Sequence, residues 1–268
     1  MEIKKVGVVG CGTMGSGIAE VCARSGYQVV VSEINDELLK KGMASIDSSM
    51  GRGVSRGKIT QQDKEAALNR IKGTTDTKDF SDCDLVIEAA IENMDLKKKI
   101  FAEVDKICPK DAILASNTSC LSVIDMAAMT SRLDRVLGMH FFNPAPVMRL
   151  LELVKTIATS DEAVETAKEF GESLGKTTII APDVPGFIVN RQLIPFQLGA
   201  IRMLEAGIAT KEDIDAGITH GLNMPMGMLT LADLVGLDTL LDVANAFTPP
   251  TLYLNYKLSY GCCHQINY

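Results

Sequence analysis

The segment "VGVVGCGTMGSGIAE", residues 6–20, constrains the fold more than any other stretch of this chain. An apolar run leads into Gly10, Gly12 and Gly15, and a helical pattern follows to about Arg24. In such a segment the first glycine turns the chain, the second lets the backbone approach a pyrophosphate, and the third lets helix and strand pack closely. The helix N-terminus then offers N–H groups and a positive dipole end to phosphates. The segment therefore predicts a strand–turn–helix unit that binds a dinucleotide.

The acidic residue Glu33 ends the next apolar run, eighteen residues after Gly15. A carboxylate at this place would accept hydrogen bonds from the hydroxyls of the adenine-side ribose. Ile34 and Asn35 follow it, and neither could pair with a 2′-phosphate. The pattern favours NAD over NADP as the cofactor. The alternative is a glycine turn in some other α/β protein, with Glu33 merely solvated.

Seven β-rich runs alternate with helical stretches between Ile3 and about Ile180: "KKVGVVG", "YQVVVSE", "DLVIEAAI", "AILASNTS", "RVLGMHFF", "LLELV" and "KTTIIA". This alternation predicts a parallel, doubly wound sheet. Near Pro185 the β-rich runs stop, and apolar residues recur at helical spacing. We therefore expect an α/β protein with a Rossmann-like domain over 1–184 and a smaller all-helical domain over 185–268. The basic stretch "GRGVSRGK", residues 51–58, is expected to interrupt a helical region between Asp36 and Arg70.

Composition narrows the class of partner. The net charge of -7, with both signs interspersed, leaves no extended cationic face for nucleic acid. No apolar run approaches the roughly 20 residues that span a bilayer, so no membrane association is expected. The opening "MEIKKVGVVGCG" is too brief for a signal peptide, which favours the cytoplasm. The seven cysteines form no C-x-x-C pair, so we expect reduced thiols and no metal site.

The stretch "GMHFFNPAPVMRLLEL" holds one of only three histidines, His140, with Glu152 twelve positions later. Imidazole titrates near neutrality and can serve as acid or base. A carboxylate on its second ring nitrogen would fix the tautomer and stabilise the imidazolium. Ser119 follows another apolar run, and ligands in open α/β sheets lie at the carboxyl ends of strands. The three residues predict an acid/base site; a packed core histidine is the alternative.

Several motifs stand in order along the chain: "GCGTMGSGIAE", "DLVIEAAIENMDLKKKIF", "ILASNTSCLS", "GMHFFNPAPVM", "LELV", "PGFIVNR" and "PMG". Over residues 3 to about 245 the chain resembles the NAD-dependent (S)-3-hydroxyacyl-CoA dehydrogenases, most closely their short 3-hydroxybutyryl-CoA form. The resemblance implies an oxidoreductase that interconverts (S)-3-hydroxybutyryl-CoA and acetoacetyl-CoA by hydride transfer with NAD. It implies that His140 accepts and donates the proton, that Glu152 orients it, and that Ser119 and Asn190 complete the catalytic set.

The resemblance also implies a set of ligand contacts. Those with the cofactor fall on Gly10, Cys11, Gly12, Thr13, Met14, Gly15, Glu33, Glu92, Lys97, Ser119 and Asn143. Those with the CoA part of the acyl-CoA substrate fall on Ser49, Arg56 and Ser119. For Asn143, before Pro144, a turn-shaping role is the alternative. For Arg52, Arg56 and Lys58 the alternative is a solvated basic face.

The chemistry follows from the residue types as well. Oxidising a secondary alcohol requires hydride to leave carbon while a base takes the hydroxyl proton. Ser119 and Asn190 are neutral donors that could hold the C3 oxygen without competing for that proton. Asn190 opens the helical domain, so the expected active site is a cleft between domains that closes to exclude water.

The segment from about residue 246, "AFTPPTLYLNYKLSYGCCHQINY", departs from the family pattern. The resemblance implies a subunit interface formed by the helical domain, so a homodimer or larger oligomer is expected. The atypical tail puts this expectation in doubt.

Two other functions remain open at this point. One is a dehydrogenase of a free hydroxy acid, which would keep the His140–Glu152 pair without a basic anchor for CoA. The other is a non-catalytic NAD(H)-binding module.

Overall fold

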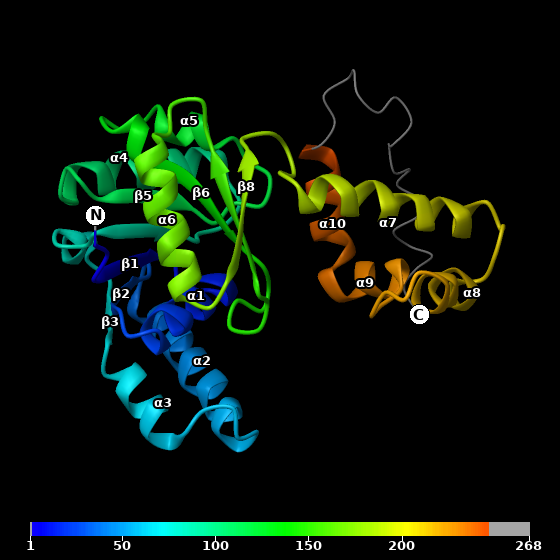
Figure 1. Ribbon diagram of the computed structural model, residues 1–268, viewed down its shortest axis with the longest axis horizontal. Helices are drawn as coiled ribbons and strands as arrows, with labels where there is room; N and C mark the ends of the chain where they lie inside the picture. Colours follow the sequence, from blue (N-terminus) through cyan, green and yellow to red (C-terminus); the bar gives the residue numbers. More distant parts are fainter. Residues whose placement is uncertain (1, 247–268) are drawn as a thin grey trace. The chain divides into compact units, whose positions relative to one another are not determined.

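The computed structural model describes residues 2–246 (Figure 1). Contacts within the chain divide it into two units, one ending at Asp183 and the other beginning at Val184. Each unit has its own apolar core. The tail predicted to be atypical lies, from Phe247 on, outside the described residues.

The first unit is built on an eight-stranded sheet in the order β3-β2-β1-β4-β5-β6-β7-β8. The strands are β1 (Lys5–Val9), β2 (Gln28–Ser32), β3 (Ile71–Thr74), β4 (Leu85–Glu88), β5 (Ile113–Ser116), β6 (Val136–Phe141), β7 (Leu150–Lys155) and β8 (Thr177–Pro182). Chain direction along the sheet is parallel from β3 to β6 and reverses at β7. The prediction of an α/β, doubly wound sheet is confirmed.

Two details of the predicted sheet are wrong. The strand β3 is missing from the prediction because its sequence, "IKGT", is short, half-buried and without an apolar run. The sheet is not parallel throughout, because β7 pairs antiparallel with β6. Only residues 142–149 join these two strands, and a parallel connection needs a crossover of a dozen residues or more.

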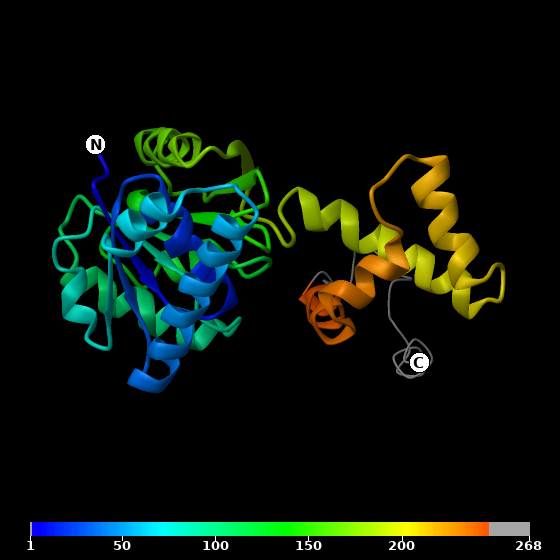
Figure 2. The same cartoon turned by 90° about the horizontal axis from the view of Figure 1, so that it is seen from below.

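Helices lie on both faces of this sheet (Figures 1 and 2). They are α1 (Thr13–Arg24), α2 (Asp36–Ser55), α3 (Gln61–Leu68), α4 (Met94–Ile107), α5 (Val123–Ala127) and α6 (Asp161–Ser173), with 3₁₀ turns η1 (Thr77–Phe80) and η2 (Leu133–Arg135). Residues of α1 and α6 share one core cluster with the strands, among them Ile18, Ala167 and Phe170. In chain order α1 follows β1, α4 follows β4 and α5 follows β5, so the carboxyl ends of these strands lead to helix N-termini.

The helix α2 corrects the prediction of a break at residues 51–58. It continues through Gly51 and Gly53 to Ser55, and only residues 56–60 separate it from α3. A Cβ on Gly53 would lie 3.3 Å from the Ile59 side chain, so the glycine lets the turn fold back onto the helix. Gly57, with φ of +65°, makes that turn.

The second unit is helical throughout its described residues, as predicted. It consists of α7 (Val189–Glu205), α8 (Lys211–Ala216), the π-helical turn η3 (Gly217–Gly221), α9 (Met228–Val235) and α10 (Leu237–Ala246). Its core includes Ile194, Leu198, Ile201, Leu229 and Leu240. Between residues 2 and 246, no helix is both long and apolar enough to cross a bilayer.

Candidate active site

The glycine loop after β1 shows why each glycine is present. Gly10 has φ of +94°, and a Cβ on Gly15 would lie 1.8 Å from the Gly10 carbonyl oxygen. These two glycines are therefore required by the chain itself. A Cβ on Gly12, by contrast, would meet no protein atom within 4 Å. The space beside Gly12 is what a ligand phosphate approaching the backbone would fill, so the loop fits a dinucleotide.

The N-terminus of α1 has the features of an anion-binding site. Gly12 is its N-cap, no side chain caps it, and its first turn carries no acid. The next helix, α2, is capped by the Asn35 side chain and has two acids in its first turn. The first N–H groups and the positive dipole end of α1 are thus left to an anionic group such as a pyrophosphate.

Glu33, one residue beyond β2, lies against the glycine loop. Its carboxylate accepts hydrogen bonds from the backbone N–H of Cys11 at 2.8 Å and of Ile34 at 3.1 Å. Burial, reinforced by Glu33, raises the pKa of the Cys11 thiol to about 12, so the thiol stays protonated. Gly42 of α2 lies against Cys11 so closely that a Cβ would be 2.3 Å from its sulfur. Glu33 is therefore held beside the glycine loop, as expected for a carboxylate that would bind the ribose of the cofactor.

His140 and Glu152 are brought together by strand pairing. They are direct partners in the antiparallel register of β6 and β7, so their side chains leave the same face of the sheet. The Nδ1 atom of His140 lies 2.7 Å from Oε2 of Glu152, and the two residues are only 6% and 0% exposed. The Phe142 ring, 4.5 Å away between centroids, contacts the imidazole.

This geometry favours the acid/base interpretation over a packed core histidine. A buried carboxylate on Nδ1 selects the proton on that nitrogen and assigns the reactive role to Nε2. His140 lies inside β6, within the β-rich run "RVLGMHFF" of the prediction. The short 142–149 loop fixes the register and hence the pairing.

A second polar cluster, in which the Lys97 side chain is buried and the Glu92 side chain is 38% exposed, holds the Ser119 loop. The Glu92 carboxylate accepts hydrogen bonds from the Ser119 backbone N–H at 3.0 Å and from the Thr118 hydroxyl at 2.5 Å. Burial by itself would raise the pKa of Glu92, but the Lys97 ammonium and these hydrogen bonds outweigh it and lower that pKa. The predicted residues Glu92, Lys97 and Ser119 therefore form one group.

Glu88, at the end of β4, completes this cluster and is absent from the predicted site. Its carboxylate accepts hydrogen bonds from the Lys97 ammonium at 2.7 Å, the Ser116 hydroxyl at 2.6 Å and the Ala90 N–H at 2.7 Å. Lys97 is fully buried and also lies 3.3 Å from Glu92. An acid that closes the apolar run "DLVIE", nine residues before a lysine, is the sequence signal that could have indicated it.

The loop after β5 is hydrogen-bonded to the end of β6. The side-chain oxygen of Asn117 accepts the Phe141 backbone N–H at 2.9 Å, next to His140. Asn143 is exposed and precedes a cis peptide bond to Pro144. Both roles weighed for Asn143, the contact with the cofactor and the shaping of the turn, stay predictions.

Three predicted residues lie in other parts of the chain. Ser49 is half-buried in α2, and Arg56, the C-cap of that helix, is exposed. Neither belongs to the two clusters around His140 and Glu92. Asn190 is the second residue of α7, in the helical unit. Their roles toward substrate stay predictions.

The fold and the glycine loop are those of a Rossmann-type protein that binds a dinucleotide. Residues 5–184 match the family described as 3-hydroxyacyl-CoA dehydrogenase, NAD binding domain, and residues 186–258 match its C-terminal domain. The chain belongs to the 3-hydroxyacyl-CoA dehydrogenase family and is an NAD-dependent oxidoreductase. The second match reaches residue 258, further than the 245 or so to which the motifs extended.

Relatives in bacteria agree with this assignment. A 3-hydroxybutyryl-CoA dehydrogenase of Mycobacterium tuberculosis is 49% identical over 245 residues, which cover 91% of this chain and 86% of that protein. A crystal structure of M. tuberculosis FadB2 matches with a TM-score of 0.90 at 47% identity, over 95% of this chain and 93% of that one. The (S)-3-hydroxybutyryl-CoA dehydrogenase PaaH1 of Ralstonia eutropha matches with a TM-score of 0.89 at 47% identity, over 91% and 87%.

Proposed function

We propose that this chain interconverts (S)-3-hydroxybutyryl-CoA and acetoacetyl-CoA with NAD. The observation that carries the proposal is the buried pair of His140 and Glu152, 2.7 Å apart on neighbouring strands. It stands in a chain 41% to 49% identical to relatives named for this substrate or given that name as probable. Membership of a dehydrogenase family sets aside the alternative of a non-catalytic module.

The residues of the pair divide the work of proton transfer. During oxidation the C3 hydroxyl proton passes to Nε2 of His140 while hydride leaves C3, and reduction runs both steps in reverse. Glu152 holds the ring in one tautomer and stabilises the imidazolium. The hydroxyl of Ser119 and the amide of Asn190 hold the C3 oxygen as its charge changes. NAD, when bound, supplies the hydride acceptor or donor.

The glycine loop and its neighbours hold the cofactor. Backbone groups of residues 10–15 contact the pyrophosphate, and Glu33 bonds the adenine-side ribose. The cluster of Glu92 and Lys97 keeps Ser119 in place, and these residues and Asn143 would contact the cofactor. Ser49 and Arg56 anchor the CoA nucleotide through a hydroxyl and a guanidinium. Residues 1–184 act as the NAD-binding domain and residues 185–268 as the helical domain.

The test is oxidation of NADH at neutral pH with acetoacetyl-CoA and, separately, with acetoacetate. Because CoA binding energy aligns the reacting carbonyl, acetoacetyl-CoA should be reduced more efficiently by about 10²-fold or more. Equal or better use of acetoacetate would favour the free hydroxy acid dehydrogenase instead. No oxidation of NADH with either compound would contradict both.

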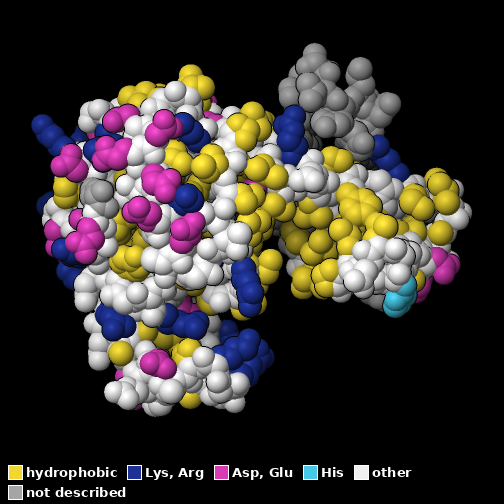
Figure 3. Space-filling view, viewed as in Figure 1, with side chains coloured by type: hydrophobic (Ala, Val, Ile, Leu, Met, Phe, Trp, Pro, Cys, Tyr) yellow, Lys and Arg dark blue, Asp and Glu magenta, His cyan; other side chains and the backbone are white. Residues whose placement is uncertain are grey.

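The chain is further proposed to act in the cytoplasm as a homodimer or larger oligomer. Five cysteines of the described part are buried free thiols, as suits a reducing compartment. Hydrophobic side chains gather on the visible face of the helical unit (Figure 3). In this unit Ile208, Leu222 and Leu234 are each more than 60% exposed. Sedimentation of the purified chain tests the oligomer.

A further inference from the structure

A buried lysine holds the loop that joins the two catalytic strands. The ammonium of Lys176, between α6 and β8, donates hydrogen bonds to the carbonyl oxygens of Ala145 at 2.6 Å and Met148 at 2.7 Å. Lys176 is only 9% exposed. Its two acceptors both belong to the loop of residues 142–149, thirty residues away in the sequence.

This loop is a compact turn with the active site at both of its ends. The N–H groups of Val147 and Met148 both donate to the Pro144 carbonyl, at 2.9 and 3.0 Å. Before the turn, Phe142 contacts the His140 ring. A shift of the turn would therefore move the ring that packs on the base.

The loop also packs against the cofactor-binding helix. A Cβ on Gly17 of α1 would lie 3.2 Å from Ala145 Cβ and from Pro146 Cδ, so the loop fits into the space that this glycine leaves. Gly17 lies two residues beyond the glycine loop. Lys176 thus binds, through Ala145, the same part of the loop that packs against α1.

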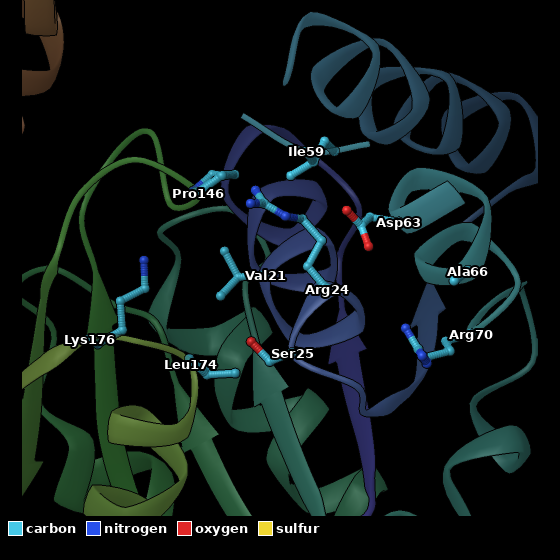
Figure 4. A pocket seen from close by; sticks show the side chains of 10 residues that line it. All are labelled: Val21, Arg24, Ser25, Ile59, Asp63, Ala66, Arg70, Pro146, Leu174 and Lys176. Carbon is cyan, nitrogen blue, oxygen red and sulfur yellow. The ribbon is translucent and has the colours of Figure 1, made fainter. Parts of the chain in front are cut away.

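The surroundings of Lys176 give a reason for its placement. It lines a cavity of about 370 Å³ together with Arg24, Asp63 and Arg70, and Figure 4 shows Asp63 and Arg70 across the cavity from Lys176. Burial and, more weakly, Arg24 lower the pKa of Lys176, while Cys22 acts in the opposite direction. Asp63 accepts hydrogen bonds from the Thr60 N–H and hydroxyl. Burying an ammonium beside other cations is costly, and here its partners are the loop carbonyls.

We propose that Lys176 is a positioning residue of the dehydrogenase reaction: its ammonium fixes the 142–149 loop, and with it Phe142 against His140 and Asn143 beside the cofactor. The kinetic test of this proposal rests on the proposed function, because it measures reduction of acetoacetyl-CoA. The physical reason is that two charge-assisted hydrogen bonds to carbonyl oxygens hold a turn that is otherwise fixed mainly by the ends of β6 and β7.

The test compares Lys176→Met, which keeps the length of the side chain and removes its donors, with Lys168→Met on the exposed surface of α6 as the matched control. In folded Lys176→Met, kcat/KM for acetoacetyl-CoA should fall by about tenfold or more, because small misplacements of reacting groups are costly. Hydrogen exchange at the Val147 and Met148 amides should become faster. Lys168→Met should change neither. A folded Lys176→Met with the wild-type rate and wild-type exchange would overturn the proposal.

Lys176→Arg provides a second variant, since the cavity has room for a guanidinium and the N–H donors are kept. Lys176→Arg should retain most of kcat/KM for acetoacetyl-CoA and the slow hydrogen exchange at the Val147 and Met148 amides. This variant keeps the proposal testable if Lys176→Met does not fold. A folded Lys176→Arg that exchanges slowly at Val147 and Met148 but has lost the rate would overturn the proposal. If the wild type fails to reduce acetoacetyl-CoA, the proposed function has failed, and the exchange at these amides still decides whether Lys176 holds the loop.

Discussion

Two groups of ionisable side chains lie at the sheet and differ in what they can do: one is buried, and the other reaches the surface at Glu92. The first is the pair of His140 and Glu152, which comes from two antiparallel strands. The second is the cluster in which Glu88 and Glu92 surround Lys97. An imidazole can serve as acid or base in catalysis, whereas the Lys97 ammonium donates hydrogen bonds to Glu88 and to the Ala90 carbonyl and lies 3.3 Å from Glu92. The proposed function gives proton transfer to the first group, whereas the second group holds the Ser119 loop through hydrogen bonds from Thr118 and Ser119 to Glu92.

Replacing His140 by Gln should have the largest effect on turnover. The variant should lose about 10²-fold or more of kcat, because general acid/base assistance is typically worth 10²- to 10⁴-fold. NADH should still bind, because the glycine loop is untouched. Steady-state kinetics and NADH fluorescence titration measure the two quantities. Retained turnover would remove His140 from the mechanism.

Replacing Glu88 by Gln should act on stability instead. The change leaves the buried Lys97 with one carboxylate fewer, and breaking a buried ion pair from one side costs about 3 kcal/mol or more. The free energy of unfolding should fall by that order, and the loss of kcat should be smaller than for His140→Gln. Denaturant unfolding beside kinetics measures both. A stable variant with kcat as low as that of His140→Gln would erase the distinction between the two groups.

Glu33→Ala should change cofactor choice. The carboxylate repels a 2′-phosphate, so the wild type should prefer NADH, and the variant should narrow the preference by about tenfold, or about 1.4 kcal/mol. The ratio of kcat/KM for NADH and NADPH is the measurement. A wild type that prefers NADPH would contradict the role given to Glu33.

The smallest expected effect concerns acid stability. The pKa of Glu92 is lowered from its ordinary 4.5, so its charged form stabilises the fold above that pH, and this contribution is lost as the pH falls below about 4.5. Glu92→Gln lacks the contribution at every pH. Thermal unfolding midpoints between pH 6 and about pH 3 should therefore fall less steeply in the variant. Parallel curves would mean that Glu92 does not carry the effect.

Much of the fold could be predicted from the sequence because strands buried on both faces leave unbroken apolar runs. The strand "IKGT" has no such run, since it lies at the edge of the sheet. The reversed direction of β7 leaves no trace in its own residues and depends on the length of the preceding loop.

The candidate site also has residues that could be predicted from the sequence and residues that could not. His140 and Glu152 could be proposed from their types and spacing, but their pairing depends on a register that only the folded strands determine. Glu88 was missed because a carboxylate that ends a strand usually meets solvent, and here Lys97 from α4 covers it. The role of Lys176 depends on two backbone carbonyls, which no side-chain pattern indicates.

The central claim is that His140 and Glu152 act as one unit in proton transfer. A double-mutant cycle tests it most directly, with kcat measured for the wild type, His140→Gln, Glu152→Gln and the variant that carries both changes. Residues that act as a unit have non-additive effects, so the account predicts that the double variant is about as slow as His140→Gln alone. A double variant slower by the product of the two single losses would contradict it.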